Sequence, residues 1–178
     1  SGERKISFLT GKACSTALKK KGYKVINLDA KGYFVEELKK LKPKIVFNAL
    51  HGRYGEDGFV QSILESLQIP YTHSGVLSSS LAMDKELSRL IFIKNNIKVP
   101  KYFLSQRDYE GNLNKKINNK KIKFPLVIKP VSEGSSLGVF ICKTKKQFTS
   151  KYKKLMEKYD RILVEEYIPG REIQVAVM

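Results

Sequence analysis

The sequence predicts an α/β protein in which a doubly wound N-terminal half-domain precedes a smaller α+β domain. Strand-like apolar runs alternate with helical patterns up to about residue 84. The pattern then changes, because two short apolar strands joined by a loop of small residues follow instead. A lysine-rich amphipathic helix and a last apolar strand complete this second region. These observations place two different α/β arrangements in one chain.

The N-terminal region alternates helical patterns with apolar runs. We expect helices at 3–22, 35–41, 59–67 and 76–95, and strands at 24–29, at 44–50 and from residue 69 into the next turn. The run at 44–50, Lys-Ile-Val-Phe-Asn-Ala-Leu, is typical of a buried parallel strand, because it is almost continuously apolar. Ligands of doubly wound sheets bind beyond the carboxyl ends of the strands. We therefore expect a ligand edge at 51–58 and 73–75.

The second region is expected to be antiparallel. We predict strands at 99–104, 126–129, 138–142 and 162–168, with a polar surface helix and loops at 106–123. Within 143–158, Phe148, Tyr152 and Leu155 recur at spacings of four and three, which indicates an amphipathic helix with a solvated lysine face.

The formal net charge of +17 raises the question of a nucleic-acid partner, because basic domains attract phosphate backbones. Lysine dominates this charge, with runs at 115–123 and 143–158, whereas arginine, which recognises phosphates bidentately, is scarce. We therefore expect no specific nucleic-acid partner, and only a long-range attraction of anionic nucleotides.

Composition also argues against other classes of protein. Hydrophobic residues make up 42% of the chain, so global disorder is not expected. No apolar stretch approaches the roughly 20 residues that a membrane-spanning helix needs. The two cysteines, Cys14 and Cys142, lie far apart without metal-type spacing, so we expect free thiols in a cytoplasmic protein.

Three segments together indicate a nucleotide site. Phe-Pro-Leu-Val-Ile-Lys-Pro at 124–130 is an apolar strand that delivers Lys129 at its end, before Pro130 interrupts the ladder. Glu-Gly-Ser-Ser-Leu-Gly at 133–138 is a loop whose backbone N–H groups and hydroxyls can surround phosphate oxygens. Ile-Leu-Val-Glu-Glu-Tyr-Ile at 162–168 is a buried strand with two acids, which can accept hydrogen bonds from an adenosine.

In this order and spacing, the three segments resemble the central domain of the ATP-grasp ligases. Two further segments are similar to signatures of the D-alanine–D-alanine ligase family: Ala-Leu-His-Gly-Arg-Tyr-Gly-Glu-Asp-Gly at 49–58, and Pro-Tyr-Thr-His-Ser-Gly-Val-Leu-Ser-Ser-Ser-Leu-Ala-Met-Asp-Lys at 70–85. The opening Ser-Gly-Glu-Arg-Lys-Ile-Ser resembles the Ser-Ala-Glu-Arg-Glu-Val-Ser stretch of that family. The resemblance extends over nearly the whole chain.

This resemblance implies an ATP-dependent ligation for cell-wall synthesis. ATP would phosphorylate the carboxylate of a first D-alanine, and the amine of a second would attack the acylphosphate to give D-alanyl-D-alanine. D-Alanine and ATP would be the substrates and Mg²⁺ the cofactor. A homodimer is the expected assembly, with no membrane partner.

The resemblance also implies roles in substrate binding. Glu3 and Ser135 would be catalytic and would hold the ammonium of the first D-alanine, since a carboxylate is the natural partner of a buried cation. His51 would lie in the dipeptide pocket with Glu56 close by. Ser136 would also contact the substrate, and it would lie with Ser135 in a loop that closes over the phosphates.

Further roles implied by the family concern the nucleotide. Lys85 and Lys129 would neutralise the α- and β-phosphates. Glu165 would accept from the adenine amino group, and Glu172 from the ribose hydroxyls. The remaining expected nucleotide contacts are Glu133, Gly134, Ser135 and Ser136 in the loop, and Glu166, Tyr167 and Ile168 beside the base.

By the same resemblance the chain is a fragment. We expect an N-terminal domain at 1–84, a central ATP-grasp subdomain at 85–172 and the start of a third domain at 173–178. Family members carry an apolar first strand before the opening segment, and their third domain carries the magnesium ligands and the second D-alanine site. We therefore expect no magnesium ligand among these residues, and no ligase turnover by residues 1–178 alone.

Three alternatives remain open at this point. The second substrate could be D-lactate or D-serine, since the residues that select it lie largely outside this sequence. Another ATP-grasp carboxylate–amine ligase is disfavoured by the segments at 49–58 and 70–85. In a different class, the chain could be a non-catalytic basic module that binds nucleotides or nucleic acid.

Overall fold

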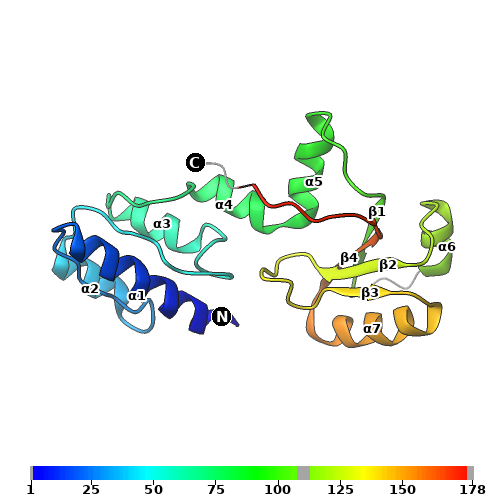
Figure 1. The fold of residues 1–178 in the computed structure, drawn as a ribbon, viewed down its shortest axis with the longest axis horizontal. Helices are drawn as coiled ribbons and strands as arrows, with labels where there is room; N and C mark the ends of the chain where they lie inside the picture. Colours follow the sequence, from blue (N-terminus) through cyan, green and yellow to red (C-terminus); the bar gives the residue numbers. More distant parts are fainter. Residues whose placement is uncertain (1, 108–112, 176–178) are drawn as a thin grey trace. The chain divides into compact units, whose positions relative to one another are not determined.

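The computed structural model describes residues 2–107 and 113–175. They form two compact units (Figure 1). The first unit runs to Ser88 and also includes Ser132–Ser135. The second comprises Arg89–Val131 and the residues from Ser136 on. The domain boundaries expected at 84/85 and 172/173 stay predictions.

The first unit is mainly helical. It contains α1 (Arg4–Lys20), α2 (Phe34–Leu41), α3 (Phe59–Ser66) and α4 (Val76–Met83), and α5 (Lys85–Lys94) begins in it. Its core is small and consists of Leu38 from α2 with Val60 and Leu64 from α3, and partly buried residues such as Leu28 and Val46 surround it. These helices match the predicted ones closely at 3–22, 35–41 and 59–67.

The strands expected in the first unit are not formed as ladders. The described residues of this unit contain one parallel bridge, Val46 to Tyr71, in which Val46 N–H donates to Pro70 O at 2.8 Å. Residues 24–29 form no strand, and Ile26 is 58% exposed. An apolar run becomes a strand only where neighbouring backbone supplies donors and acceptors. Among the described residues of this unit, the run at 44–50 finds such a backbone partner only at the Val46–Tyr71 bridge. This bridge is parallel, as the sequence predicts.

The single helix predicted at 76–95 is interrupted at Asp84. This residue has extended backbone angles (φ −85°, ψ 105°), and its Oδ1 accepts from the N–H groups of Glu86 and Leu87 at 2.9 and 3.0 Å. An aspartate that caps new N–H groups in this way begins a second helix. The segment is therefore two helices, α4 and α5.

The second unit is built on a four-stranded antiparallel sheet. The strands are β1 (Tyr102–Gln106), β2 (Leu126–Pro130), β3 (Phe140–Cys142) and β4 (Arg161–Glu166), in the order β1-β4-β2-β3. All three pairings are antiparallel, as the sequence predicts. β4 is central, and its Glu165 lies opposite Tyr102 of β1 and Val127 of β2.

One face of this sheet is covered by α7 (Lys145–Lys158) (Figure 1). Leu126, Ile128, Ile162 and Val164 point to that face and pack with Phe148 and Leu155 of the helix. Side chains alternate between faces along a strand. Lys129, Leu163 and Glu165 therefore lie on the opposite face, which is the face relevant to the site.

The predicted surface helix in 106–123 is only partly a surface element. α6 (Leu113–Asn119) forms there, and Ile117 and Ile122 are 7% and 4% exposed within the core of the second unit. Because most residues of this segment are polar, its sequence pattern did not indicate that Ile117 and Ile122 would be buried.

Candidate functional site

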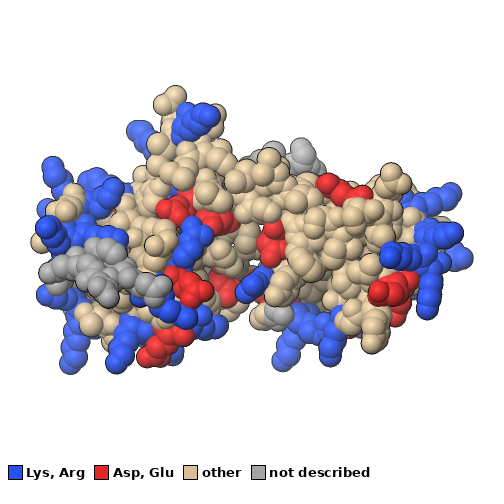
Figure 2. Space-filling view, turned by 180° about the vertical axis from the view of Figure 1, so that it is seen from behind, with Lys and Arg blue, Asp and Glu red and all other residues tan. Residues whose placement is uncertain are grey.

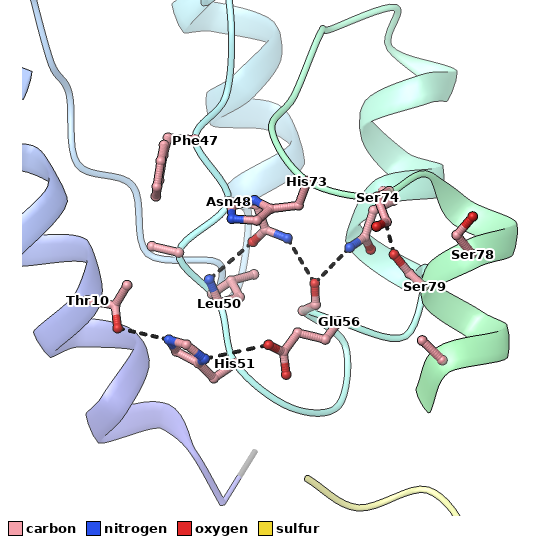
Figure 3. Close-up of a pocket in the computed structure, with 14 residues that line it drawn as sticks. Thr10, Phe47, Asn48, Leu50, His51, Glu56, His73, Ser74, Ser78 and Ser79 are labelled. Atoms are coloured by element: carbon pink, nitrogen blue, oxygen red, sulfur yellow. Dashed lines mark hydrogen bonds and ion pairs between the residues drawn. The ribbon is translucent and has the colours of Figure 1, made fainter. Parts of the chain in front are cut away.

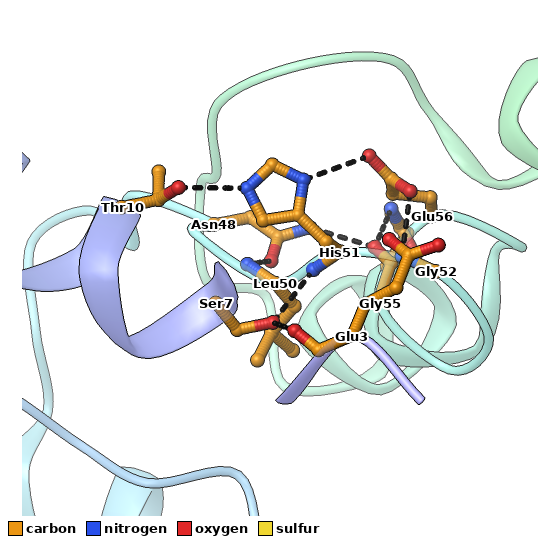
Figure 4. A network of polar contacts seen from close by, with 10 residues as sticks. Glu3, Ser7, Thr10, Asn48, Leu50, His51, Gly52, Gly55 and Glu56 are labelled. Carbon is orange, nitrogen blue, oxygen red and sulfur yellow. Dashed lines mark hydrogen bonds and ion pairs between the residues drawn. The ribbon is translucent and has the colours of Figure 1, made fainter. Parts of the chain in front are cut away.

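His51 is the centre of a polar network in the first unit (Figure 4). Its Nε2 lies 2.8 Å from Thr10 Oγ1 of α1, and its Nδ1 lies 3.6 Å from Glu56 Oε1. Its backbone N–H donates to Ser7 Oγ at 3.0 Å. Thr10 of α1 and Glu56 thus contact the imidazole through its two ring nitrogens, and Ser7, about one turn before Thr10, holds the backbone of His51.

The loop that carries His51 and Glu56 is held by buried amides. Asn48 Nδ2 and Gln61 Nε2 both donate to the carbonyl of Gly55 at 2.9 Å. A Cβ at Gly55 would lie 2.4 Å from Leu50 Cβ, so only glycine fits this close turn. Gly52 N–H donates to Glu56 Oε2 at 2.6 Å, which orients the carboxylate. The predicted glycine-rich loop is therefore a rigid support.

Glu3 is 5% exposed although it is a charged residue near the start of the chain. A Cβ added at Gly52 would lie 3.1 Å from its Cδ, and one added at Gly134 would lie 2.8 Å from its Oε1. Both glycines therefore allow the carboxylate a close approach to the backbone. Glu3 immediately precedes α1, whose first residue, Arg4, donates two hydrogen bonds to the carboxylate of Asp29 at 3.0 and 2.5 Å. These hydrogen bonds hold the pKa of Asp29 below its usual value.

Glu3, His51 and Glu56 each offer a ligand atom within 4.8 Å of the others. The sequence predictions assigned all three to substrate binding, and the structure brings them together. Magnesium prefers an all-oxygen octahedral shell, often with several waters. A set that contains an imidazole does not fit that preference, so this cluster is not a magnesium site of the expected kind.

A pocket of about 260 Å³ opens beside this network (Figure 3). Asn48, His51 and Glu56 line it together with polar groups from the turn before α4 and from α4 itself. These further residues are His73, Ser74, Ser78 and Ser79. The expected ligand edge at 51–58 and 73–75 is thus a concave surface rich in hydrogen-bonding groups.

The predicted phosphate loop has an unusual backbone. Ser135 and Ser136 have φ values of 45° and 58°, and Gly138 has 74°. Non-glycine residues rarely adopt positive φ, and such strain is concentrated at ligand-binding sites. In the first unit, Lys85 Nζ donates to the carbonyl of Glu133, so the lysine at the start of α5 contacts the start of this loop.

The face of the sheet opposite α7 carries a buried charged trio. Lys129 Nζ lies 2.5 Å from Glu165 Oε1, and Arg89 Nη2 donates to Glu165 Oε2. The side chains of Arg89, Lys129 and Glu165 are 10%, 19% and 6% exposed. The structure therefore brings the predicted Lys129 and Glu165 into direct contact.

Arg89 is a residue that the sequence predictions missed. It lies in a helix with ordinary amphipathic spacing, 76 positions before Glu165, and no local motif distinguishes it. Only the packing of α5 in the second unit reveals the pairing.

The remaining predicted nucleotide contacts are less enclosed. Glu166 Oε1 accepts from Lys101 N–H at 2.9 Å. Tyr167 and Ile168 are 37% and 59% exposed, and Glu172 is also exposed. The structure does not bring these last three into the charged trio, and their roles stay predictions.

The face of the molecule in Figure 2 carries both basic and acidic side chains. On the face shown in Figure 2, Lys and Arg side chains are scattered over both units, with acidic side chains between them. Among the described helices, none is long and apolar enough to cross a membrane.

Comparison with known families assigns both regions consistently. Residues 29–74 match the model of the D-ala D-ala ligase N-terminus, and residues 91–178 match the model of the D-ala D-ala ligase C-terminus. The chain belongs to the D-alanine–D-alanine ligase family. The N-terminus model matches before the C-terminus model along the chain, as their descriptions imply. The matched regions include His51, Lys129 and Glu165.

Individual relatives agree with this assignment. The chain is 50% identical to a D-alanine–D-alanine ligase of Pelagibacter ubique and 43% identical to one of Parvibaculum lavamentivorans, in both cases over its whole length. It spans 58% and 56% of those two relatives. A crystal structure of the Bacillus anthracis D-alanine–D-alanine ligase complexed with ATP matches with a TM-score of 0.82 and 34% identity. That match covers 96% of this chain and 56% of the other.

Proposed function

We propose that this chain forms part of a cytoplasmic ligase that joins two D-alanines at the expense of ATP for peptidoglycan precursor synthesis. The observation that carries the proposal is the consecutive match to both D-alanine–D-alanine ligase models. Because the chain spans 58% of the first relative, the activity belongs to the longer protein. Residues 1–178 alone are expected to show no turnover.

The face of the sheet opposite α7 is proposed to bind the nucleotide. Arg89 and Lys129 bring two positive charges and Glu165 one negative charge, so the buried trio carries a net charge of about +1. A buried excess charge is costly, and an anion is its natural partner. Lys129 and Lys85 are therefore proposed to bind phosphate oxygens, and Glu165 to accept from the adenine amino group.

The loop and the last strand complete the proposed nucleotide site. The backbone at Glu133, Gly134, Ser135 and Ser136 would surround the phosphates. The backbone of Glu166, Tyr167 and Ile168 would follow the edge of the base, and Glu172 would accept from the ribose hydroxyls.

The amino-acid half of the site is the Glu3–His51–Glu56 cluster. Glu3 is buried and carries the charge that a substrate ammonium requires. Held there with Ser135, the first D-alanine would present a carboxylate oxygen to the γ-phosphorus of ATP. An acylphosphate forms and ADP leaves, after which the amine of the second D-alanine attacks the carbonyl carbon and inorganic phosphate leaves.

Mg²⁺ accompanies ATP in this proposal. When bound, it would neutralise developing charge on the phosphates and would take oxygen ligands from the protein. The one cluster of three acidic or imidazole groups among the described residues does not fit it. We propose that its protein ligands belong to the longer protein, and that the longer protein is a homodimer.

The decisive experiment measures phosphate release from ATP by the complete protein. We expect stimulation by D-alanine and not by L-alanine, and a loss of at least about 100-fold in Lys129→Ala, because a phosphate-binding cation is removed. Arg107→Met is the matched control, since it deletes an exposed ion pair with Asp160 beside the ends of β1 and β4.

Other outcomes of this experiment would change the assignment. Stimulation that requires D-lactate or D-serine as the second substrate would replace the product but keep the chemistry. A protein that binds no ATP would contradict the proposal. Salt-sensitive retention on DNA without any nucleotide effect would favour a basic binding module instead.

A further inference from the structure

The trio of Arg89, Lys129 and Glu165 contains two cations of different character. Each oxygen of Glu165 has one cationic partner, Oε1 with Lys129 and Oε2 with Arg89. Among the described residues, Glu165 is the one carboxylate with which either cation forms an ion pair. The two cations therefore share a single counter-charge, and one of them is available to a second anion.

Arg89 is the cation that stays in place. Its guanidinium carbon lies 5.0 Å from the centre of the Tyr102 ring, and its side chain is 10% exposed. A planar guanidinium stacked on an aromatic ring is fixed in orientation. Lys129 has a flexible aliphatic stem and is more exposed, at 19%. Lys129 is thus the member that can exchange its partner.

The burial of Arg89 is not explained by stability alone. Its Nη1 is buried and has no hydrogen-bond partner within the described part of the chain. Buried ion pairs contribute little net stability compared with apolar side chains of similar size, and an unsatisfied buried donor adds a penalty. An arginine in such a place is better accounted for by what it does to Glu165.

We propose that Arg89 is a positioning residue of the nucleotide site: it fixes the orientation of the Glu165 carboxylate, so that Lys129 can transfer from that carboxylate to a phosphate of the nucleotide. Without Arg89, the transfer of Lys129 would leave a buried carboxylate unpaired. Lys129 would then stay with Glu165, and both the phosphate contact and the base contact would weaken. This inference rests on the proposed function, because Arg89 would position a residue of the proposed nucleotide site.

The first test is a double-mutant cycle on ATP affinity in the complete protein. Arg89→Met keeps the length of the side chain and removes its charge, and it should weaken ATP binding by at least about tenfold. In the Lys129→Ala background the same change should cost less than in the parent, because no lysine remains to be released and only the orientation of Glu165 toward the base is lost. Equal losses in the two backgrounds would overturn the proposal.

Two comparisons separate positioning from a general loss of structure. Arg89→Lys restores a cation beside Oε2 but not the planar group stacked on Tyr102, so it should recover only part of the ATP affinity that Arg89→Met loses. Inosine triphosphate lacks the adenine amino group, so the preference for ATP over it should fall in Arg89→Met. If Arg89→Met weakens both nucleotides equally and Arg89→Lys gives no rescue, Arg89 is only a packing residue.

A readout that needs no nucleotide keeps this inference distinct from the proposed function. In Arg89→Met, Glu165 has Lys129 as its one remaining cation, so an amine-acylating reagent should modify Lys129 at least about threefold more slowly. The exposed Lys120 serves as internal reference, and Arg107→Met as control. An unchanged rate at Lys129 overturns the inference. Slower modification in a protein that binds no ATP would show instead that the proposed function fails while the pairing holds.

Discussion

Similar apolar runs form different structures in the two units. Leu-Val-Ile-Lys at 126–129 forms the paired strand β2, in which Ile128 is fully buried. Lys-Ile-Val-Phe at 44–47 forms a single bridge, and Ile45 and Phe47 are 60% and 43% exposed. β2 has a partner on each side, β4 and β3, whereas the run in the first unit has its bridge on one side among the described residues. A strand pattern is therefore realised only where neighbours complete the ladder.

The candidate site reflects this difference. In the second unit, Lys129 and Glu165 occupy registered ladder positions, so their spacing follows from the pairing of β2 with β4. In the first unit, His51 and Glu56 lie on a loop that is positioned by side-chain amides and hydroxyls. The positions of Lys129 and Glu165 should therefore depend on the packing of the sheet. The positions of His51 and Glu56 should depend on individual hydrogen bonds.

The largest expected effect contrasts two isoleucines in these runs. Ile128→Ala should destabilise the protein by about 2–5 kcal/mol, because it removes buried methylenes and leaves a cavity. Ile45→Ala should change stability by no more than about 0.5 kcal/mol, since the side chain is largely exposed. Urea unfolding of both variants measures the contrast. Similar losses for the two would mean that Ile45 is packed in solution and that the contrast between the units does not hold.

A smaller effect is expected from the amide that supports the His51 loop. Asn48→Ala removes the donor to Gly55 O and the acceptor for Leu50 N–H, so it should cost about 1–3 kcal/mol. Gln61 still donates to Gly55 O, which limits the loss. Asn118→Ala, on the exposed side of α6, is the matched control. Thermal melting checks this, and equal shifts in the two variants would contradict a special role for Asn48.

The next effect concerns a helix cap in the second unit. Gln147 N–H donates to Thr144 Oγ1 at 3.3 Å at the start of α7. Thr144→Ala should cost about 1 kcal/mol, and Thr144→Ser should cost much less because it keeps the hydroxyl. Urea unfolding distinguishes them, and a loss that Thr144→Ser does not recover would assign the effect to the methyl group.

The smallest effect is a pH dependence at the buried thiol of Cys142. Burial raises the pKa of the Cys142 thiol above its ordinary value of 9.0, while Lys151 opposes this shift. The folded protein therefore binds that proton more tightly than the unfolded chain, and the stability from Cys142 is lost as the pH rises through the raised pKa. Alkylation should modify Cys14 first at every pH, and Cys142 only at higher pH or on unfolding. Equal rates at pH 8 would show that the core around Cys142 is open.

Local sequence patterns predicted several helices and strands of the second unit. The spacing of Phe148, Tyr152 and Leu155 predicted α7, and the apolar run at 162–168 predicted the central strand, because both follow from short-range periodicity. The family segments led to Lys129, Glu165, His51 and Glu56, although their individual roles remain predictions.

Other features depended on contacts that no local pattern encodes. The break at Asp84 is made by one side chain that caps the next helix inside an otherwise continuous apolar pattern. The expected strands at 24–29 and 44–50 depended on ladder partners, which a run of apolar residues does not specify.

The sequence by itself determined the α/β class, the family and the residue types of the site, because motif spacing and apolar periodicity are local properties of the chain. Only the tertiary structure decided which charges meet. Arg89 and Glu165 are 76 positions apart, and their pairing arises from the packing of α5 in the second unit. A buried ion pair needs two backbones to bring its partners within hydrogen-bonding distance while water is excluded, and this condition depends on the fold as a whole.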